Sequence, residues 1–139
     1  MLAIGKRNRE NPMARKPKKR SLKCKLDKVV SQIVRTRGKC ERCGVVNQLQ
    51  CCHIFSRTYM SVRFFLTNLL CLCAGCHFWA HKNPILFAEF VKKYFGKYKY
   101  TQLKLKARMI KKWSISELEV LLETLEERLV NYCLVKKEG

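Results

Sequence analysis

The 139-residue sequence predicts a small α+β domain, with a zinc-stabilised centre between N-terminal and C-terminal helices. Two CxxC pairs bracket the centre, which spans residues 40–81, and apolar residues recur at helical spacing on either side of it. A chain of this length forms one domain with tails. We expect a basic disordered tail over residues 1–22, a core over 23–96 and a helical extension over 97–139.

The N-terminal part divides into a tail and a helix. Residues 1–22 are rich in Lys and Arg and offer little to bury, which is typical of a disordered segment. Such a segment is either a solvated leader or an arm that follows phosphates, and the sequence favours neither. From Leu22 to Thr36, apolar residues follow a helical period up to Gly38, which ends the helix. These residues are Leu26, Val29, Val30, Ile33 and Val34.

The C-terminal part predicts three helices. The first has Asn83 as its cap, Pro84 in its first turn and Gly96 at its exit. A short basic helix follows over residues 101–113. The last helix covers residues 114–134, with Ser116 and Glu119 as a capping box. Its apolar stripe is typical of a core face or of a face that binds a partner helix. The stripe consists of Leu118, Leu121, Leu122, Leu125 and Leu129.

The charge of the chain indicates a polyanionic partner. Thirty Lys and Arg stand against ten acidic residues, a formal net charge of +20, and nucleic acid is the first choice of partner. No run approaches the roughly 18 apolar residues of a membrane helix, and the basic N-terminus lacks the apolar stretch of a secretory signal. The only aspartate is Asp27, and no carboxylate cluster lies in the centre, which excludes nucleases that bind two magnesium ions through such clusters.

The cysteines predict one structural zinc. Seven of nine lie between residues 40 and 76, and without a secretory signal such pairs favour metal over disulfides. Two CxxC pairs suit one tetrahedral Zn²⁺ with four thiolates, a closed site without an open position for substrate. Gly44 and Gly75 would provide the backbone freedom of the two turns. The four ligands are Cys40, Cys43, Cys73 and Cys76.

The three histidines of the chain all lie between residues 53 and 81. If four sulfurs satisfy the zinc, His53, His77 and His81 are left for another task. His77 and His81 stand one helical turn apart, so both can face the same ion. The alternative is that one histidine replaces a cysteine in the zinc shell.

The segments "LQCCHIF", "LTNLLCLC" and "CHFWAH" resemble the HNH nucleases, the ββα-metal or His-Me-finger fold. The H, N and H of the family name correspond to His53, Asn68 and His77. The resemblance covers residues 40–81. The helix that leads into CxxC, followed by "VRFFLTNLLCLCAGCH", is similar to the NinG-like (Rap-like) phage recombination proteins, which act on branched DNA. This resemblance implies a phage-encoded protein that works in the bacterial cytoplasm.

The resemblance implies a hairpin of residues 49–54 and 69–72 that presents His53 beside the next helix. His53 would be the general base, Asn68 would fix its ring, and His77 and His81 would hold one divalent ion (Mg²⁺, Mn²⁺ or Zn²⁺), so that the three imidazoles converge on it. Cleavage of duplex or branched DNA would leave a 5′-phosphate and a 3′-hydroxyl. The residues expected to meet neighbouring phosphates are Arg57, Arg63 and Lys82.

One departure concerns the residue before the general base, where the family has Asp or His as a third ligand. This chain has Cys52, which either binds the ion or leaves that corner to water, and Cys51 is its rival on the face of His53. A thiolate would favour zinc over magnesium. Two other functions stay open: a non-catalytic zinc-stabilised nucleic-acid-binding module, and an adaptor that binds through the leucine stripe. That stripe also makes a homodimer plausible.

Overall fold

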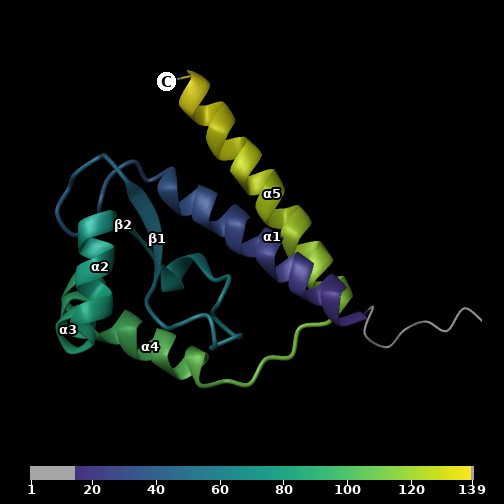
Figure 1. Cartoon of the computed structure of the whole chain (residues 1–139), viewed down its shortest axis with the longest axis horizontal. Helices are drawn as coiled ribbons and strands as arrows, with labels where there is room; N and C mark the ends of the chain where they lie inside the picture. Colours follow the sequence, from purple (N-terminus) through teal and green to yellow (C-terminus); the bar gives the residue numbers. More distant parts are fainter. Residues whose placement is uncertain (1–14, 139) are drawn as a thin grey trace, which may run out of the picture.

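The computed structural model describes residues 15–138, which form five α-helices and one two-stranded sheet (Figure 1). The α+β class is therefore confirmed. Of the helices in this part of the chain, none combines the length and the apolar character needed to cross a bilayer. The elements are α1 Arg15–Arg35, β1 Leu49–His53, the 3-10 turn η2 Leu66–Asn68, β2 Leu69–Cys73, α2 Ala74–Lys82, α3 Pro84–Phe95, α4 Lys97–Ala107 and α5 Ile115–Glu138.

The antiparallel hairpin of β1 and β2 lies between two layers of helices (Figure 1). Side chains alternate along a strand, so Leu69 and Cys71 face one layer while Leu70 and Leu72 face the other. All four are almost completely buried. The first pair packs with α1 and α5, and the second pair packs with α2 and α3. Burial on both faces explains why β2 reads as a continuous apolar run.

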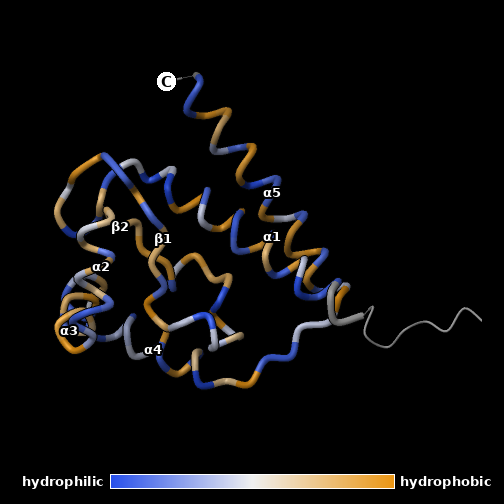
Figure 2. The backbone as a smooth tube through the Cα atoms, in the orientation of Figure 1, coloured by the Kyte–Doolittle hydropathy of each residue, from blue (hydrophilic) through white to orange (hydrophobic). Residues whose placement is uncertain are grey.

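Helices α1 and α5 lie side by side and form the larger layer (Figure 1). Figure 2 shows that hydrophobic and hydrophilic residues alternate along both, as amphipathic helices require. Leu118 and Leu125 of α5 are buried against α1, and the rest of the predicted leucine stripe packs on the same cluster. The stripe is therefore core within one chain. The adaptor and the homodimer stay predictions.

Three expectations about helix ends differ from the structure. Helix α1 begins at Arg15, so residues 15–22 are helical rather than disordered, and residues 1–14 of the expected tail lie outside the described part. Lys and Arg are good helix formers, and Lys18 lies 3.2 Å from Glu119 of α5. The basic helix α4 covers residues 97–107 instead of 101–113.

The capping box of α5 is formed by Ser114 and Glu117 instead of Ser116 and Glu119. The Ser114 hydroxyl accepts from the Glu117 N–H at 3.1 Å, and the Ser114 N–H donates to the Glu117 carboxylate at 2.9 Å. The earlier start lets Ile115 and Trp113 pack against the α1 cluster. By contrast, Gly96 ends α3 as expected, with a φ of 87°.

Candidate metal and histidine centre

The four cysteines of the CxxC pairs come together as predicted, with all ligand atoms within 4.8 Å of one another. Sulfurs bound to one tetrahedral zinc at about 2.3 Å lie about 3.8 Å apart. The observed separation of the Cys43 and Cys73 sulfurs, 3.6 Å, fits that edge. The cluster is compatible with a structural Zn²⁺ that joins the turn after α1 to the junction of β2 and α2.

Each CxxC pair forms a turn whose first sulfur accepts a backbone N–H. The Cys43 N–H donates to Cys40 Sγ at 3.5 Å, and the Cys76 N–H donates to Cys73 Sγ at 3.4 Å. Gly44 has the expected positive φ of 82°, whereas Gly75 lies in the first turn of α2 and its φ is not positive. The second turn needs no such freedom, since the start of a helix already supplies its shape.

The electrostatics of the cluster favour thiolates at one corner. Burial raises the pKa of Cys40, but the N–H groups of Cys43, Cys73 and Arg42 outweigh it and hold that pKa at about 6. Burial raises the pKa of Cys76, and the Arg42 guanidinium, which donates to Cys76 Sγ at 3.4 Å, acts in the opposite direction. Arg42 also stacks on the Trp79 ring at 3.6 Å from its centroid.

Glu41, inside the first CxxC pair, connects the cluster to the sheet. The sequence did not predict this role. Its N–H donates to the Cys71 carbonyl at 2.8 Å, and its carboxylate accepts from the Cys71 N–H at 2.7 Å. Arg37 and the Tyr94 hydroxyl also bind this carboxylate, at 2.9 and 3.0 Å. The first turn is therefore held against β2 through both the backbone and the side chain of Glu41.

A second centre is formed by the three histidines, which line one cavity of about 580 Å³ together with residues of β1, α2 and α3. Outside the cysteine cluster, the residues that the structure describes contain no further group of three metal-ligating side chains that come this close together. The histidines share a cavity, then, but their rings do not converge on one point. The histidine ligands available to one ion here are therefore the pair His77 and His81.

His77 and His81 face each other on α2, with 3.1 Å between their Nε2 atoms. Nitrogens bound at 2.0–2.1 Å to one ion lie about 2.9 Å apart at an octahedral angle and about 3.4 Å apart at a tetrahedral angle. The observed separation falls between these values. Two imidazoles one helical turn apart thus already have the spacing of a chelating pair.

Gln50 of β1 orients this pair, and the sequence analysis missed it. Its side-chain oxygen lies 2.7 Å from Nδ1 of His77. An oxygen accepts, so Nδ1 carries the proton and the Nε2 lone pair of His77 points to His81. Burial lowers the pKa of His77, and the neighbouring His81 and Arg57 lower it further, which favours the neutral ring that a metal ion needs.

His53 lies at the end of β1 and is held by a backbone carbonyl. Its Nε2 is 3.2 Å from the carbonyl oxygen of Arg63. A carbonyl only accepts, so Nε2 carries the proton and Nδ1 keeps a free lone pair. Burial lowers the pKa of His53, as does the nearby Arg57. The ring is therefore a neutral base at pH 7.

Asn68 is completely buried, and its side chain hydrogen-bonds the backbone after His53 rather than the imidazole. Its side-chain oxygen accepts from the Phe55 N–H at 2.8 Å, and its amide donates to the Phe55 carbonyl at 2.9 Å. Its own carbonyl accepts from the Ile54 N–H at 2.8 Å. Asn68 thus anchors the chain that follows His53, and it acts on the ring through the backbone.

The two rival cysteines before His53 face different layers. Cys52 packs with Ala80 of α2 and the α3 residues, whereas Cys51 packs against the α1 cluster. Burial raises the pKa of Cys52 to about 12 and that of Cys51 to about 11, so both are neutral thiols at pH 7. Both line the histidine cavity, and neither joins the His77 pair within ligand distance.

The three residues expected to meet phosphates differ in their exposure and in whether their charge is already paired. Arg57 is exposed and lines the histidine cavity. Arg63 is engaged by Asp27, with nitrogen–oxygen distances of 2.6 and 3.2 Å, so its guanidinium is already neutralised. This partner on α1 could not be foreseen from spacing. Lys82 is exposed beside the Phe78 ring, 5.5 Å from its centroid.

Comparisons with protein-family models, with curated proteins and with solved structures find no match to this chain.

Proposed function

We propose that the chain is a metal-dependent DNA endonuclease of the HNH type, in which β1, β2 and α2 form the ββα-metal finger. The observation that carries this proposal is the His77–His81 pair at chelating distance in the cavity that His53 also lines. The cysteine cluster and the net charge of +20 support it, since the first stabilises a small fold and the second favours DNA.

The residues divide the chemistry between them. His53 Nδ1 takes the proton of the attacking water, because Nε2 is held by the Arg63 carbonyl. His77 and His81 present Nε2 atoms to one divalent ion, and Gln50 keeps His77 in the required tautomer. That ion would polarise a phosphate oxygen and stabilise the leaving 3′-oxygen. Water would complete its coordination, since Cys52 does not come within ligand distance of the His77 pair.

Asn68 is a positioning residue in this scheme, and Arg57 meets a phosphate next to the cut. The products carry a 5′-phosphate and a 3′-hydroxyl. The resemblance to NinG-like proteins makes branched DNA the first substrate to test, and it extends the proposal to a phage-encoded enzyme in the bacterial cytoplasm.

The test compares wild type with His53→Ala on linear duplex, nicked duplex and four-way junction, each with Mg²⁺, Mn²⁺, Ni²⁺ or Zn²⁺. General base catalysis contributes roughly 10²–10⁴-fold, so His53→Ala should cut at least about 100-fold more slowly. DNA affinity and zinc content should persist. The matched control is Asn47→Ala, an exposed amide in the loop before β1, which should cut as wild type does.

Ligation of the products without prior kinase treatment checks for the 5′-phosphate. If wild type cuts none of these substrates with any of the ions but still binds DNA, the zinc-stabilised nucleic-acid-binding module is the better description.

A further inference from the structure

The outer face of α1 carries a straight row of basic side chains. One residue advances a helix by about 100°, so Arg20, Lys28 and Arg35 fall within about 80° of one another. All three are exposed. The buried residues Leu26 and Ile33 lie on the opposite side of the helix, against α5 and the sheet. We call Arg20, Lys28 and Arg35 the α1 basic row.

Two hollows run beside this row, and basic residues line both of them. One includes Lys28, Arg35 and Arg57, and the other includes Arg20. The basic residues at the second hollow are Lys19, Arg20, Lys23 and Arg63. The acidic residue at either hollow is Asp27, which is neutralised by Arg63 at 2.6 Å. Asp27 and Arg63 cancel each other, and the remaining lysines and arginines leave this face positively charged.

The row is continuous with the histidine centre. Arg57 lines both the histidine cavity and the hollow beside Lys28 and Arg35. Cys24 lines both hollows, so they adjoin each other along α1. A polymer whose phosphate lies at the histidines can therefore continue past Arg57 and along the whole row.

We propose that the α1 basic row binds the sugar–phosphate backbone of duplex DNA on one side of the bond that the histidine centre cuts. This inference rests on the proposed function. From Arg20 to Arg35 the helix rises about 22 Å, which equals six or seven base pairs of duplex at about 3.4 Å each. A long, straight row of charges that leads into the cutting site fits a polyanion of repeating charge.

Two exposed cysteines allow a test in the unaltered sequence. Cys24 lies in the row between Arg20 and Lys28, whereas Cys133 lies on α5 and lines neither hollow. Zinc-loaded protein is alkylated with iodoacetamide, with and without saturating 30-base-pair duplex and without added divalent ion, and each peptide is quantified by mass spectrometry. Bound DNA should slow the alkylation of Cys24 several-fold and leave Cys133 unchanged. An unchanged rate at Cys24 would overturn the proposal.

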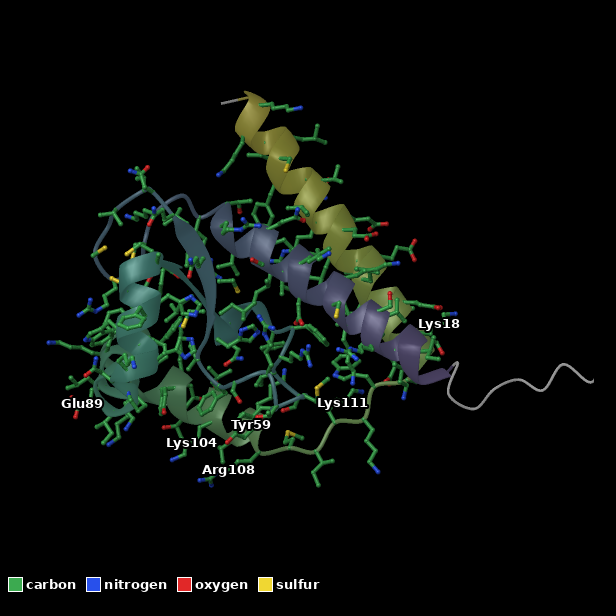
Figure 3. All side chains as sticks on the ribbon, viewed as in Figure 1. Lys18, Tyr59, Glu89, Lys104, Arg108 and Lys111 are labelled. Carbon is green, nitrogen blue, oxygen red and sulfur yellow. The ribbon has the colours of Figure 1, made fainter. Side chains whose placement is uncertain are left out.

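A charge-neutralised variant tests the same surface by affinity. The triple variant Arg20→Gln, Lys28→Gln and Arg35→Gln is compared with a control that removes three exposed lysines from α4, Lys97, Lys99 and Lys104. Figure 3 shows Lys104 on α4, well separated from Lys18 at the start of α1. Glutamine is a good helix former, so α1 should persist, and circular dichroism checks this.

The readout is the slope of log Kobs for DNA against log salt concentration. Each lost phosphate contact lowers that slope by about 0.9, so the α1 triple variant should lower it by about 2–3 and the α4 variant by less than about 1. Equal slopes for the two variants would refute the proposal. So would a loss of binding to anionic lipid vesicles without a loss of binding to DNA.

The result is separable from that of the proposed function, because binding is measured without cutting. If wild type cuts no DNA but the α1 variant has a smaller salt dependence of DNA binding, the proposal for the α1 basic row is supported and the endonuclease proposal is refuted. If wild type cuts DNA and both variants bind it equally, the endonuclease proposal is supported and the proposal for the α1 basic row is refuted.

Discussion

The substitution Asn68→Ala should destabilise the protein strongly, although Asn68 lies in the short 3-10 turn η2. Asn68 has no exposed surface, and both ends of its amide bind the backbone of Phe55, at 2.8 and 2.9 Å. Alanine removes both partners at once and leaves the Phe55 N–H and carbonyl without them. The segment that follows His53 then loses its anchor on η2.

The expected cost follows from these two contacts. A buried backbone group that loses its partner costs about 1–3 kcal/mol, and Phe55 is half-buried, so water can satisfy part of the loss. We therefore expect the free energy of unfolding to fall by about 2–4 kcal/mol. With a urea m-value of about 2 kcal/mol/M, the midpoint should shift by about 1–2 M.

The assay is urea unfolding of the zinc-loaded protein, followed by circular dichroism, with the exposed Asn47→Ala as control. Asn68→Asp separates hydrogen bonding from volume, since it keeps the acceptor but sets a carboxylate oxygen against the Phe55 carbonyl. It should be destabilised as well. A shift for Asn68→Ala within about 0.5 kcal/mol of the control would refute the anchoring role.

Four further predictions follow from the described contacts. Cys40→Ser should leave the purified protein almost free of zinc by atomic emission, and a retained full equivalent would contradict the four-sulfur site. Gln50→Ala should weaken Ni²⁺ binding roughly 10–100-fold in calorimetry, because the tautomer of His77 is no longer held, and unaltered affinity would count against that role. Since burial lowers the pKa of His53, the base stays neutral until the pH falls below its ordinary value of about 6.5. Cutting should therefore fail only below that pH, and an acid limb with a midpoint above it would be inconsistent with this. Ser114→Ala should lower the free energy of unfolding by about 1 kcal/mol in urea, and an unchanged value would show that Ser114 does not stabilise α5 as a cap.

The sequence predicted the parts of the fold that obey short-range rules. Helical periodicity placed the buried faces of α1 and α5, and the spacing of the CxxC pairs placed Cys40 and Cys73 in one cluster. In the helix faces and in the cysteine cluster alike, the spacing of residues along the chain determines which side chains come together. The helix start at Arg15 was missed because the basic residues before Leu22 show no apolar period, and the contact of Lys18 with Glu119 joins residues far apart in the chain.

The candidate site was predicted less completely. Three imidazoles in a short window predicted convergence on one ion, whereas the structure places all three at one cavity without bringing the rings to one point. Spacing alone could not show that His53 is held by the Arg63 carbonyl. Gln50 and Asp27 act across elements, on His77 and Arg63, so no local pattern marks them. The contact of Asn68 with Phe55, rather than with the ring, likewise depends on how η2 meets the end of β1.

The most direct measurement counts the metal ions that zinc-loaded protein holds, by native mass spectrometry in the presence of Ni²⁺, an ion that imidazole binds well. Wild type should hold one Zn²⁺ in the cysteine cluster and one Ni²⁺ at His77 and His81, whereas His81→Ala should keep the Zn²⁺ and lose the Ni²⁺. Wild type that takes up no Ni²⁺, or His81→Ala that takes up as much as wild type, would contradict a metal-binding histidine centre.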